Sequence, residues 1–188
     1  MKKVLRKKYI LNRNNLSKDY RESSTNSIFS TLEKCSFFET SEKIFIFVGF
    51  DSEIQTENFI KKWINKKQIF VPKIENGKMN LIRLKSWDEL APGHFGVLEP
   101  TSSDYYEGKI DLVVTPSIVF DKNGYRLGYG KGYYDRYFTE NEYRISVGLC
   151  YHKLLQENVP KEEHDKQVDI IITEEKTFII NEEYNSNN

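Results

Sequence analysis

The sequence predicts an α/β fold: a three-layer single domain with a mixed, mostly parallel sheet and helices on both of its faces. Apolar runs stand at residues 43–50, 112–114 and 144–149, and the first is nearly continuous, as in strands buried on both faces. Stretches with helical spacing separate these runs. A length of 188 residues suits one domain. We therefore expect one domain over residues 1–188, with a polar tail at about 181–188.

The composition excludes several classes of protein. Lys+Arg and Asp+Glu number 28 each, so the net charge offers no basis for binding nucleic acid or a membrane surface. The two cysteines, Cys35 and Cys150, stand in unrelated contexts, which argues against a disulfide framework and suits a reducing compartment. No signal peptide or transmembrane run is expected. We expect a cytoplasmic protein that is a monomer or at most a weak homodimer.

The first part of the chain predicts two helices, a strand and a third helix. Residues 2–13 carry apolar side chains at helical spacing among many lysines and arginines, which on residue grounds form a solvated basic face. A second helix is expected over residues 17–34, with Ser17 as its N-cap. The strand at 43–50 is followed by helical spacing at residues 59–64.

The middle of the chain predicts shorter elements. Residues 68–71 form a short strand that Pro72 ends or places at an edge. Glu-Asn-Gly-Lys at 75–78 predicts a hairpin turn into a returning strand at 81–84. A short helix beginning near Ser86 and a long loop up to residue 108 follow.

The most informative stretch is a glycine-rich loop at residues 128–132, Gly-Tyr-Gly-Lys-Gly. We expect residues 117–120 to be a central strand before it, and a helix to start near Tyr133 after it. Strand, glycine loop and helix N-terminus together can hold an anion. Arg126 and Lys131 add positive charge, and Asp135 can hold a metal ion beside bound phosphates.

Two familiar phosphate loops do not match this stretch. A Walker A loop requires a glycine at position 125 and Ser or Thr at 132, where Tyr125 and Gly132 stand. The dinucleotide fingerprint requires a glycine at Tyr133. A tight turn with aromatic packing therefore stays open as an alternative, although packing alone does not require the mixture of Arg, Lys, Tyr and Asp found here.

The whole string is more specific than its parts. Arg126-Leu-Gly-Tyr-Gly-Lys-Gly-Tyr-Tyr-Asp135, preceded by Phe120-Asp121 and a turn, resembles the signature of the 5-formyltetrahydrofolate cyclo-ligases, also called 5,10-methenyltetrahydrofolate synthetases. The resemblance implies ATP- and Mg²⁺-dependent conversion of 5-formyltetrahydrofolate to 5,10-methenyltetrahydrofolate. ADP and phosphate would be released after phosphorylation of the formyl oxygen and attack by N10. Further matches run in the family's order from Lys2 to Asp169.

The resemblance also implies roles for individual residues. Glu53 opens a Glu-x-x-Thr match and would contact the pterin, and Asp165 lies in a His-Asp-x-x-Val-Asp match. Arg126 and Lys131 would be catalytic, and Asp135 and Asp165 would hold Mg²⁺. The residues implied for ATP are Lys2, Lys3, Arg6, Arg126, Gly128, Tyr129, Gly130, Lys131, Gly132, Tyr133 and Tyr134. Those implied for the folate are Val48, Glu53, Phe95, Tyr129, Gly130, Lys131, Gly132 and Tyr133.

Other interpretations stay open at this point. Glu53 alone would pass for a charge at a helix N-terminus. Ser117 replaces the glycine of most family members, which requires that this residue keep a negative φ. The chain as a whole is also compatible with a nucleotide-binding module without catalysis, or with another small-molecule enzyme that uses the loop for a sugar phosphate.

Overall fold

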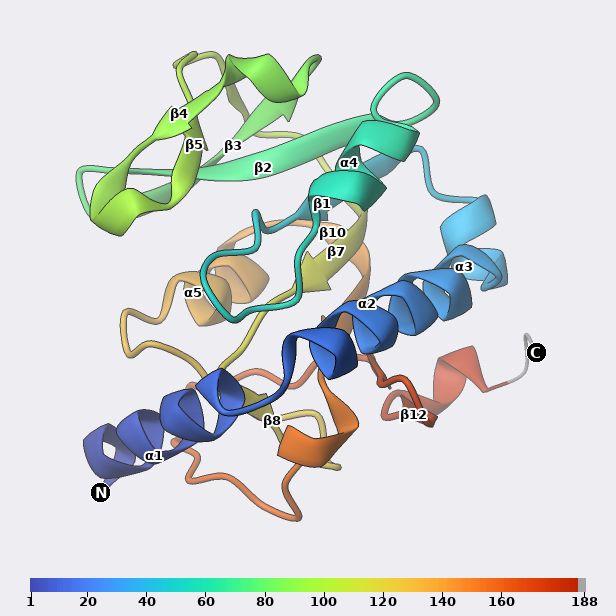
Figure 1. The fold of residues 1–188 in the computed structure, drawn as a ribbon. Helices are drawn as coiled ribbons and strands as arrows, with labels where there is room; N and C mark the ends of the chain where they lie inside the picture. The colour runs from blue at the N-terminus through green and yellow to red at the C-terminus, as the bar shows by residue number, and fades with distance from the viewer. Residues whose placement is uncertain (186–188) are drawn as a thin grey trace.

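A mixed eight-stranded sheet forms the centre of the computed structural model, which describes residues 1–185 (Figure 1). Its strands, in spatial order, are β12 (Thr177–Ile179), β11 (Ile170–Ile172), β10 (Tyr143–Leu149), β7 (Ile110–Thr115), β1 (Lys43–Ile46), β2 (Gln68–Glu75), β3 (Lys78–Leu84) and β6 (Tyr105–Tyr106). The strands from β11 to β2 pair in parallel, whereas β12, β3 and β6 are antiparallel at the edges. The prediction of a mixed, mostly parallel sheet is confirmed.

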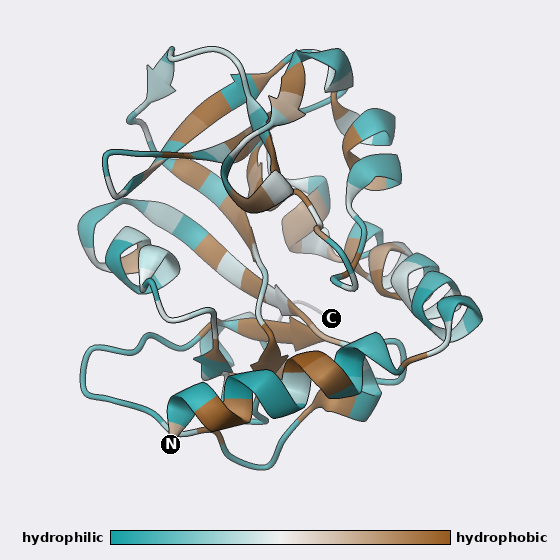
Figure 2. Cartoon of the chain, turned by 60° about the vertical axis from the view of Figure 1, so that its left-hand side comes forward, coloured by the Kyte–Doolittle hydropathy of each residue, from teal (hydrophilic) through white to brown (hydrophobic). Residues whose placement is uncertain are grey.

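Helices cover both faces of this sheet. On one face lie α2 (Lys18–Glu33), α3 (Ser36–Glu39) and α4 (Glu57–Trp63), whose side chains join Ile44 and Ile46 of β1 in the larger core cluster. On the other face, α5 (Tyr133–Glu140) packs Tyr137 and Phe138 against Phe45. Neighbouring residues of β1 thus point to opposite faces, as the period of a strand requires. Figure 2 shows the hydrophobic stretches along the central strands.

Helix α1 (Lys2–Asn14) lies beside β8 (Val119–Phe120) at one end of the sheet (Figure 1). Its apolar side chains Leu5 and Tyr9 pack against the larger cluster, and Tyr9 donates a hydrogen bond to Gln156 over 3.0 Å. The predicted helices at 2–13 and 17–34 are confirmed, and Ser17 caps the second by accepting from the Tyr20 N–H.

Two strand predictions near β1 and β2 change at the strand ends. The strand expected over 43–50 ends at Ile46, and β2 runs on past Val71 to Glu75, so Pro72 does not end it. The other alternative, that Pro72 stands at an edge, is confirmed. Pairing between β1 and β2 reaches only Phe70, so beyond it β2 pairs with β3 alone. A proline is tolerated there because that side of the strand needs no N–H donor.

Two further predictions change in detail. Residues 117–120 do not join the central sheet: β8 pairs with β9 (Arg126–Leu127) in a separate hairpin. The long loop expected up to residue 108 contains a second hairpin and β6. This hairpin consists of β4 (Leu90–Pro92), the turn η2 (His94–Gly96) and β5 (Leu98–Pro100). The short helix expected near Ser86 is the turn η1 (Trp87–Glu89).

The last described residues are held by hydrogen bonds to the body of the protein. After the turn η3 (His152–Leu154), β11 and β12, the chain forms η4 (Glu182–Tyr184). Asn181 Nδ2 donates to Asp169 over 3.0 Å, and the Tyr184 hydroxyl donates to the Arg144 carbonyl over 2.6 Å. Of the predicted polar tail, 186–188 lie outside the described residues. Within residues 1–185, no helix combines the length and apolarity that crossing a membrane requires.

Candidate active site

Three cations of α1 share one face of the helix, because Lys2, Arg6 and Arg13 are spaced by four and seven residues. Arg6 Nε donates to the Gly128 carbonyl over 2.7 Å, although the two residues are 122 positions apart. A Cβ added to Gly130 would lie 3.0 Å from Arg6 Cζ. The guanidinium therefore lies directly against the glycine loop, residues 128–132.

The glycine loop requires its glycines. Gly130 has φ +95° and Gly132 has φ +67°, both in the left-handed region. Gly132 is the N-cap residue of α5, which begins at Tyr133 as predicted. The free N–H groups at this helix start can bind an anion. Lys131, within the loop, is exposed, and Lys3 on α1 is exposed as well.

A buried ion pair lies behind the loop. Arg126 Nη2 donates to Asp135 Oδ1 over 2.6 Å, and the Arg126 side chain is only 6% exposed. Arg126 Nη1 donates to the Lys166 carbonyl over 2.8 Å, while the Lys166 N–H donates to Asp135 Oδ1 over 3.0 Å. This network connects the start of α5 to the segment that carries Asp165.

Carboxylates next to Lys2 provide a candidate metal site. Glu162, His164 and Asp165 place one ligand atom each within 4.8 Å of one another. Lys2 Nζ lies 3.2 Å from Asp165 Oδ2 and 3.4 Å from Glu162 Oε1. The two carboxylates fit Mg²⁺, which prefers oxygen ligands. Asp135 is not in this cluster, and its Oδ1 is already bound by Arg126 and Lys166.

Glu53 is presented by a tight loop after β1. Thr56 Oγ1 donates to the Phe47 carbonyl over 2.8 Å and accepts from the Gly49 N–H over 3.0 Å. A Cβ at Gly49 would meet the Ile54 carbonyl oxygen at 2.3 Å, so only glycine fits. Thr56 thus explains the Glu-x-x-Thr pattern as a loop closure that positions Glu53.

Glu53 is 9% exposed, and its carboxylate accepts two hydrogen bonds. Its Oε2 accepts from the Phe50 N–H over 3.0 Å, and its Oε1 accepts from the Tyr129 hydroxyl over 2.8 Å. Burial raises the pKa of Glu53, and these bonds oppose the shift only in part. Burial and the neighbouring Glu53 also raise the pKa of Tyr129 to about 12.

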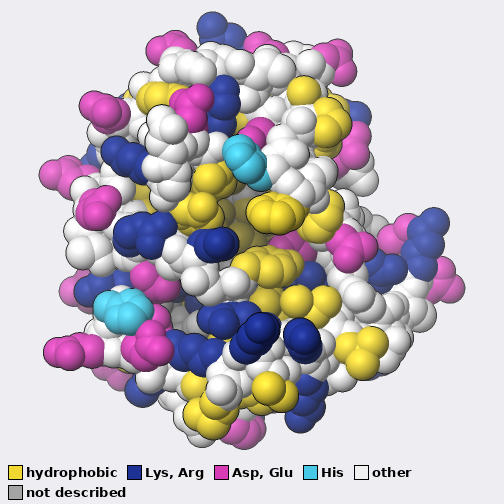
Figure 3. All heavy atoms as spheres, turned by 90° about the vertical axis from the view of Figure 1, so that its left-hand side faces the viewer, with side chains coloured by type: hydrophobic (Ala, Val, Ile, Leu, Met, Phe, Trp, Pro, Cys, Tyr) yellow, Lys and Arg dark blue, Asp and Glu magenta, His cyan; other side chains and the backbone are white. Residues whose placement is uncertain are grey.

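The remaining predicted residues differ in their surroundings. Phe95 is 87% exposed at the tip of the β4–β5 hairpin with φ 57°, whereas Val48 is buried. Figure 3 views the molecule from the left-hand side of Figure 1. It shows hydrophobic side chains in the middle of that face, with Lys and Arg below them. The Tyr133 ring lies under the Arg136 guanidinium, but Tyr134 stacks on Phe45 in the core. Tyr134 can therefore offer only its backbone to a ligand in the loop.

Residues 1–174 match the family model of the 5-formyltetrahydrofolate cyclo-ligases. The chain belongs to this family. The resemblance of the glycine-loop signature is thereby confirmed, and the family and fold together support cyclo-ligase activity.

Individual cyclo-ligases resemble this chain over most of its length. A probable 5-formyltetrahydrofolate cyclo-ligase of Caenorhabditis elegans is 28% identical over 181 residues, which span 87% of this chain and 88% of the relative. The mouse cyclo-ligase is 30% identical over 154 residues, spanning 73% and 76%. The NMR structure of Aquifex aeolicus 5,10-methenyltetrahydrofolate synthetase is 30% identical, with a TM-score of 0.86 over 95% of this chain and 92% of that one.

Two residues at the site of this cyclo-ligase, Arg13 and Ser52, were not predicted from the sequence. Arg13 is 3% exposed, and its Nε donates to Ser52 Oγ over 2.9 Å. Its Nη2 donates to the Tyr129 hydroxyl over 2.9 Å. Its position on the helix face of Lys2 and Arg6 was the available signal. Ser52 carried none, because its role depends on a contact 39 residues away.

Proposed function

We propose that the protein closes the ring of 5-formyltetrahydrofolate to give 5,10-methenyltetrahydrofolate, with ATP consumed and ADP and phosphate released. One observation carries this proposal: two groups of side chains meet on adjacent residues of the glycine loop. Arg6 contacts the Gly128 carbonyl, and Glu53 contacts the Tyr129 hydroxyl. The residues that would bind phosphate and those that would bind folate are therefore neighbours.

The phosphate side consists of cations and backbone N–H groups. Lys2, Lys3, Arg6 and the N–H groups of the glycine loop would hold the triphosphate. Arg126 and Lys131 would offset charge on the phosphoryl group during its transfer. Such contacts supply positioning and charge stabilisation, which dominate phosphoryl transfer.

The folate side would orient the formyl group toward the γ-phosphate. Glu53 would accept hydrogen bonds from the pterin, while Val48, Phe95, Tyr129 and Tyr133 would contact the rings. Phosphorylation of the formyl oxygen turns a poor leaving group into a good one. N10 then attacks the same carbon, the C–O bond breaks, phosphate leaves and the N10 proton is released. Proximity of N10 to that carbon is the contribution of the protein to this step.

For Mg²⁺, Asp165 and Glu162 are the residues that fit best, with Asp135 joining through the carboxylate oxygen that Arg126 does not occupy. When bound, the ion would neutralise phosphate charge beside the reacting phosphorus. Lys2 bonds to both carboxylates of the cluster and lies at its edge, next to where phosphates would bind.

Domain organisation, oligomeric state and compartment are also part of what we propose. The protein would comprise one domain over residues 1–188 and act as a monomer or a weakly associating homodimer in the cytoplasm. The free thiols of Cys35 and Cys150 suit a reducing compartment. The nucleotide-binding module and the sugar-phosphate enzyme are less well supported, because the relatives carry the cyclo-ligase name.

The test mixes the purified protein with 5-formyltetrahydrofolate and Mg-ATP and follows the near-ultraviolet absorbance of the methenyl product. We expect a rise that requires ATP, and its loss in Asp135→Ala. No rise from folded, ATP-binding protein would refute the proposed reaction. Normal turnover by Asp135→Ala would refute the assignment of Asp135 alone.

A further inference from the structure

Arg13 is a buried cation that the reaction outlined above leaves without a role. Its side chain reaches from the last turn of α1 into the interior, where its Nε and Nη2 are bound by Ser52 and Tyr129. Nη1 is also buried, yet it has no hydrogen-bond partner within residues 1–185. A buried, unpaired N–H group of a charged side chain is costly and requires an explanation.

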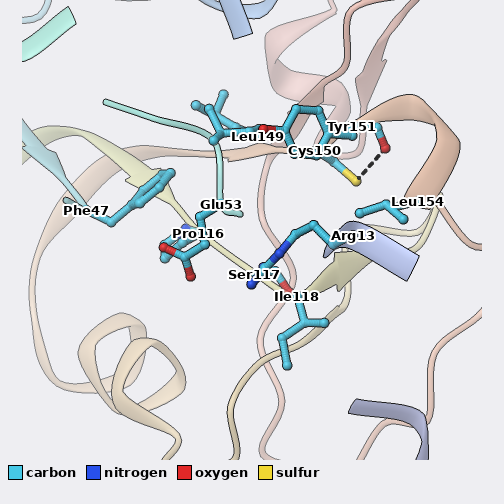
Figure 4. A pocket seen from close by; sticks show the side chains of 11 residues that line it. Arg13, Phe47, Glu53, Pro116, Ser117, Ile118, Leu149, Cys150, Tyr151 and Leu154 are labelled. Atoms are coloured by element: carbon cyan, nitrogen blue, oxygen red, sulfur yellow. Dashed lines mark hydrogen bonds between the residues drawn. The ribbon is translucent and has the colours of Figure 1, made fainter. Parts of the chain in front are cut away.

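Arg13, which carries the unpaired nitrogen, belongs to a cavity wall. Arg13, Glu53 and Ser117 line a cavity at the carboxyl ends of β1, β7 and β10, where ligands of open α/β sheets bind. Figure 4 shows the Arg13 side chain extending toward Ser117 and the Glu53 carboxylate. The cavity therefore presents a hydrogen-bond donor and an acceptor side by side.

The Tyr129 hydroxyl holds this arrangement together. It accepts from Arg13 Nη2 over 2.9 Å and donates to Glu53 Oε1 over 2.8 Å. Each Glu53 oxygen accepts one hydrogen bond from the protein and retains a second lone pair. Carboxylate and guanidinium are thus fixed with free hydrogen-bonding capacity on both.

We propose that Arg13 is a specificity-determining residue that donates from Nη1 to the 4-oxo oxygen of the pterin, while Glu53 accepts from its 2-amino and N3–H groups. The pterin edge offers two donors followed by one acceptor, which complements a carboxylate beside a guanidinium. The inference rests on the proposed function, which places the pterin at Glu53. It explains why an arginine is buried here with one nitrogen unpaired.

The test compares two ligands that differ in the group on C4 and, as a consequence, at N3. 5-Formyltetrahydrofolate and its 4-amino-4-deoxy analogue are titrated calorimetrically into wild type, Arg13→Met and Arg13→Lys. The analogue presents a donor to Nη1 in place of an acceptor, and its N3 is an acceptor that faces Glu53 in all three proteins, so the change in the affinity ratio between proteins reports on Arg13. We expect Arg13→Met to lose about 10- to 100-fold in affinity for the 4-oxo ligand. The preference for 4-oxo over 4-amino should fall by a similar factor, and Arg13→Lys should retain part of it.

The ratio of the two affinities separates recognition from a structural role. If Arg13→Met weakens both ligands equally, Arg13 only supports Glu53 and the proposal is overturned. Tyr129→Phe is the matched control, because it removes the bridging hydroxyl but keeps Nη1; it should weaken both ligands and preserve the ratio. If Arg13→Met does not fold, the ratio in Arg13→Lys decides, and an unchanged ratio there overturns the proposal.

Glu53→Gln distinguishes failure of this inference from failure of the proposed function. If Glu53→Gln binds 5-formyltetrahydrofolate as tightly as wild type, the pterin does not lie at Glu53, and both the folate placement and the role of Arg13 are wrong. If Glu53→Gln weakens binding but the 4-oxo preference survives in both Arg13 variants, only the role of Arg13 is wrong.

Discussion

Burial opposes the ionised state of Glu53 that the proposed pterin contact requires. Burial raises the pKa of Glu53 and Asp51 adds to the rise, whereas the Phe50 N–H, the Tyr129 hydroxyl and the charge of Arg13 lower it. The net shift is upward. Folate affinity should therefore be lost as pH falls through a pKa above the ordinary carboxyl range.

The same shift predicts the effect of Glu53 on stability. The folded protein binds this proton more tightly than the unfolded chain, so the contribution of Glu53 to the free energy of unfolding rises as pH falls from neutrality. Glu53→Gln should be at least as stable as wild type at pH 7, with a flatter pH dependence. Urea unfolding at pH 7 and 5.5 measures the free energy of unfolding of both proteins. Marked destabilisation of Glu53→Gln at pH 7 would contradict this prediction.

The same variant should also lose turnover of the folate. We expect Glu53→Gln to lower kcat/KM for the folate about 10- to 100-fold.

Two tyrosine hydroxyls should differ in the effect of their removal. The Tyr129 hydroxyl connects Arg13 to Glu53, so Tyr129→Phe leaves two buried groups short of a partner and should cost about 1–3 kcal/mol. The Tyr137 hydroxyl has no partner within residues 1–185. Tyr137→Phe should therefore leave the free energy of unfolding unchanged or raise it by up to about 1 kcal/mol. Urea denaturation compares the two, and a large loss in Tyr137→Phe would contradict this prediction.

At the scale of elements, α1 and the glycine loop form one unit. Arg6 bonds to the Gly128 carbonyl and lies against Gly130, so the loop conformation and the helix position depend on each other. Thr56 similarly joins the end of β1 to the loop that carries Glu53.

Gly130 and Gly128 provide a matched pair for testing this unit. Gly130→Ala would place a methyl group 3.0 Å from Arg6 Cζ at φ +95°, a conformation that costs a non-glycine residue about 1–2 kcal/mol. A Cβ at Gly128 meets nothing within 4 Å, and its φ is not positive. We expect Gly130→Ala to raise KM for ATP at least about tenfold, while Gly128→Ala changes it little. Steady-state kinetics measures both, and equal effects would contradict a specific role for Gly130.

At the scale of the molecule, the site joins the two ends of the chain. Lys2 and Asp165 are 163 residues apart in sequence, yet their side chains are bonded. A ligand that holds both should stabilise the whole fold, because it binds only the native state.

This connection predicts a metal-dependent thermal shift. Mg-ATP at 100 times its Kd should add about 2.7 kcal/mol, which raises Tm by about 5–10 °C for a domain of this size. Chelation of the metal, or Asp165→Asn, should reduce the shift to that of ATP alone. Lys7→Gln, an exposed change on the same helix, should leave the shift intact. A full shift in Asp165→Asn would refute the metal assignment.

Local signals in the sequence predicted several elements correctly. Ser17 caps α2 as expected, and Asn76 and Gly77 adopt the positive φ values of a tight hairpin turn. Ser117 keeps a negative φ, as its replacement of a glycine required, and its hydroxyl lies within hydrogen-bonding distance of the Val119 and Leu127 carbonyls. Each of these features depends on a few neighbouring residues, so the sequence alone suffices.

Features that depend on distant partners could not be predicted in this way. Pro72 is tolerated within β2 because β1 has already ended, and β8 leaves the central sheet because β9 pairs with it. The residues around Pro72 do not encode where β1 ends, and the residues of β8 do not encode that β9 will pair with it.

The sequence by itself determined the α/β class, the alternation of its main elements, the glycine loop and the family signature, because hydrophobic period and turn chemistry are local properties of the chain. The tertiary structure alone decided which of the N-terminal cations contact the loop, that Arg126 is buried against Asp135, and that Arg13 faces Glu53 through Tyr129. The physical reason is that those contacts connect residues far apart in sequence, and their geometry exists only once the sheet has brought the carboxyl ends of its parallel strands together.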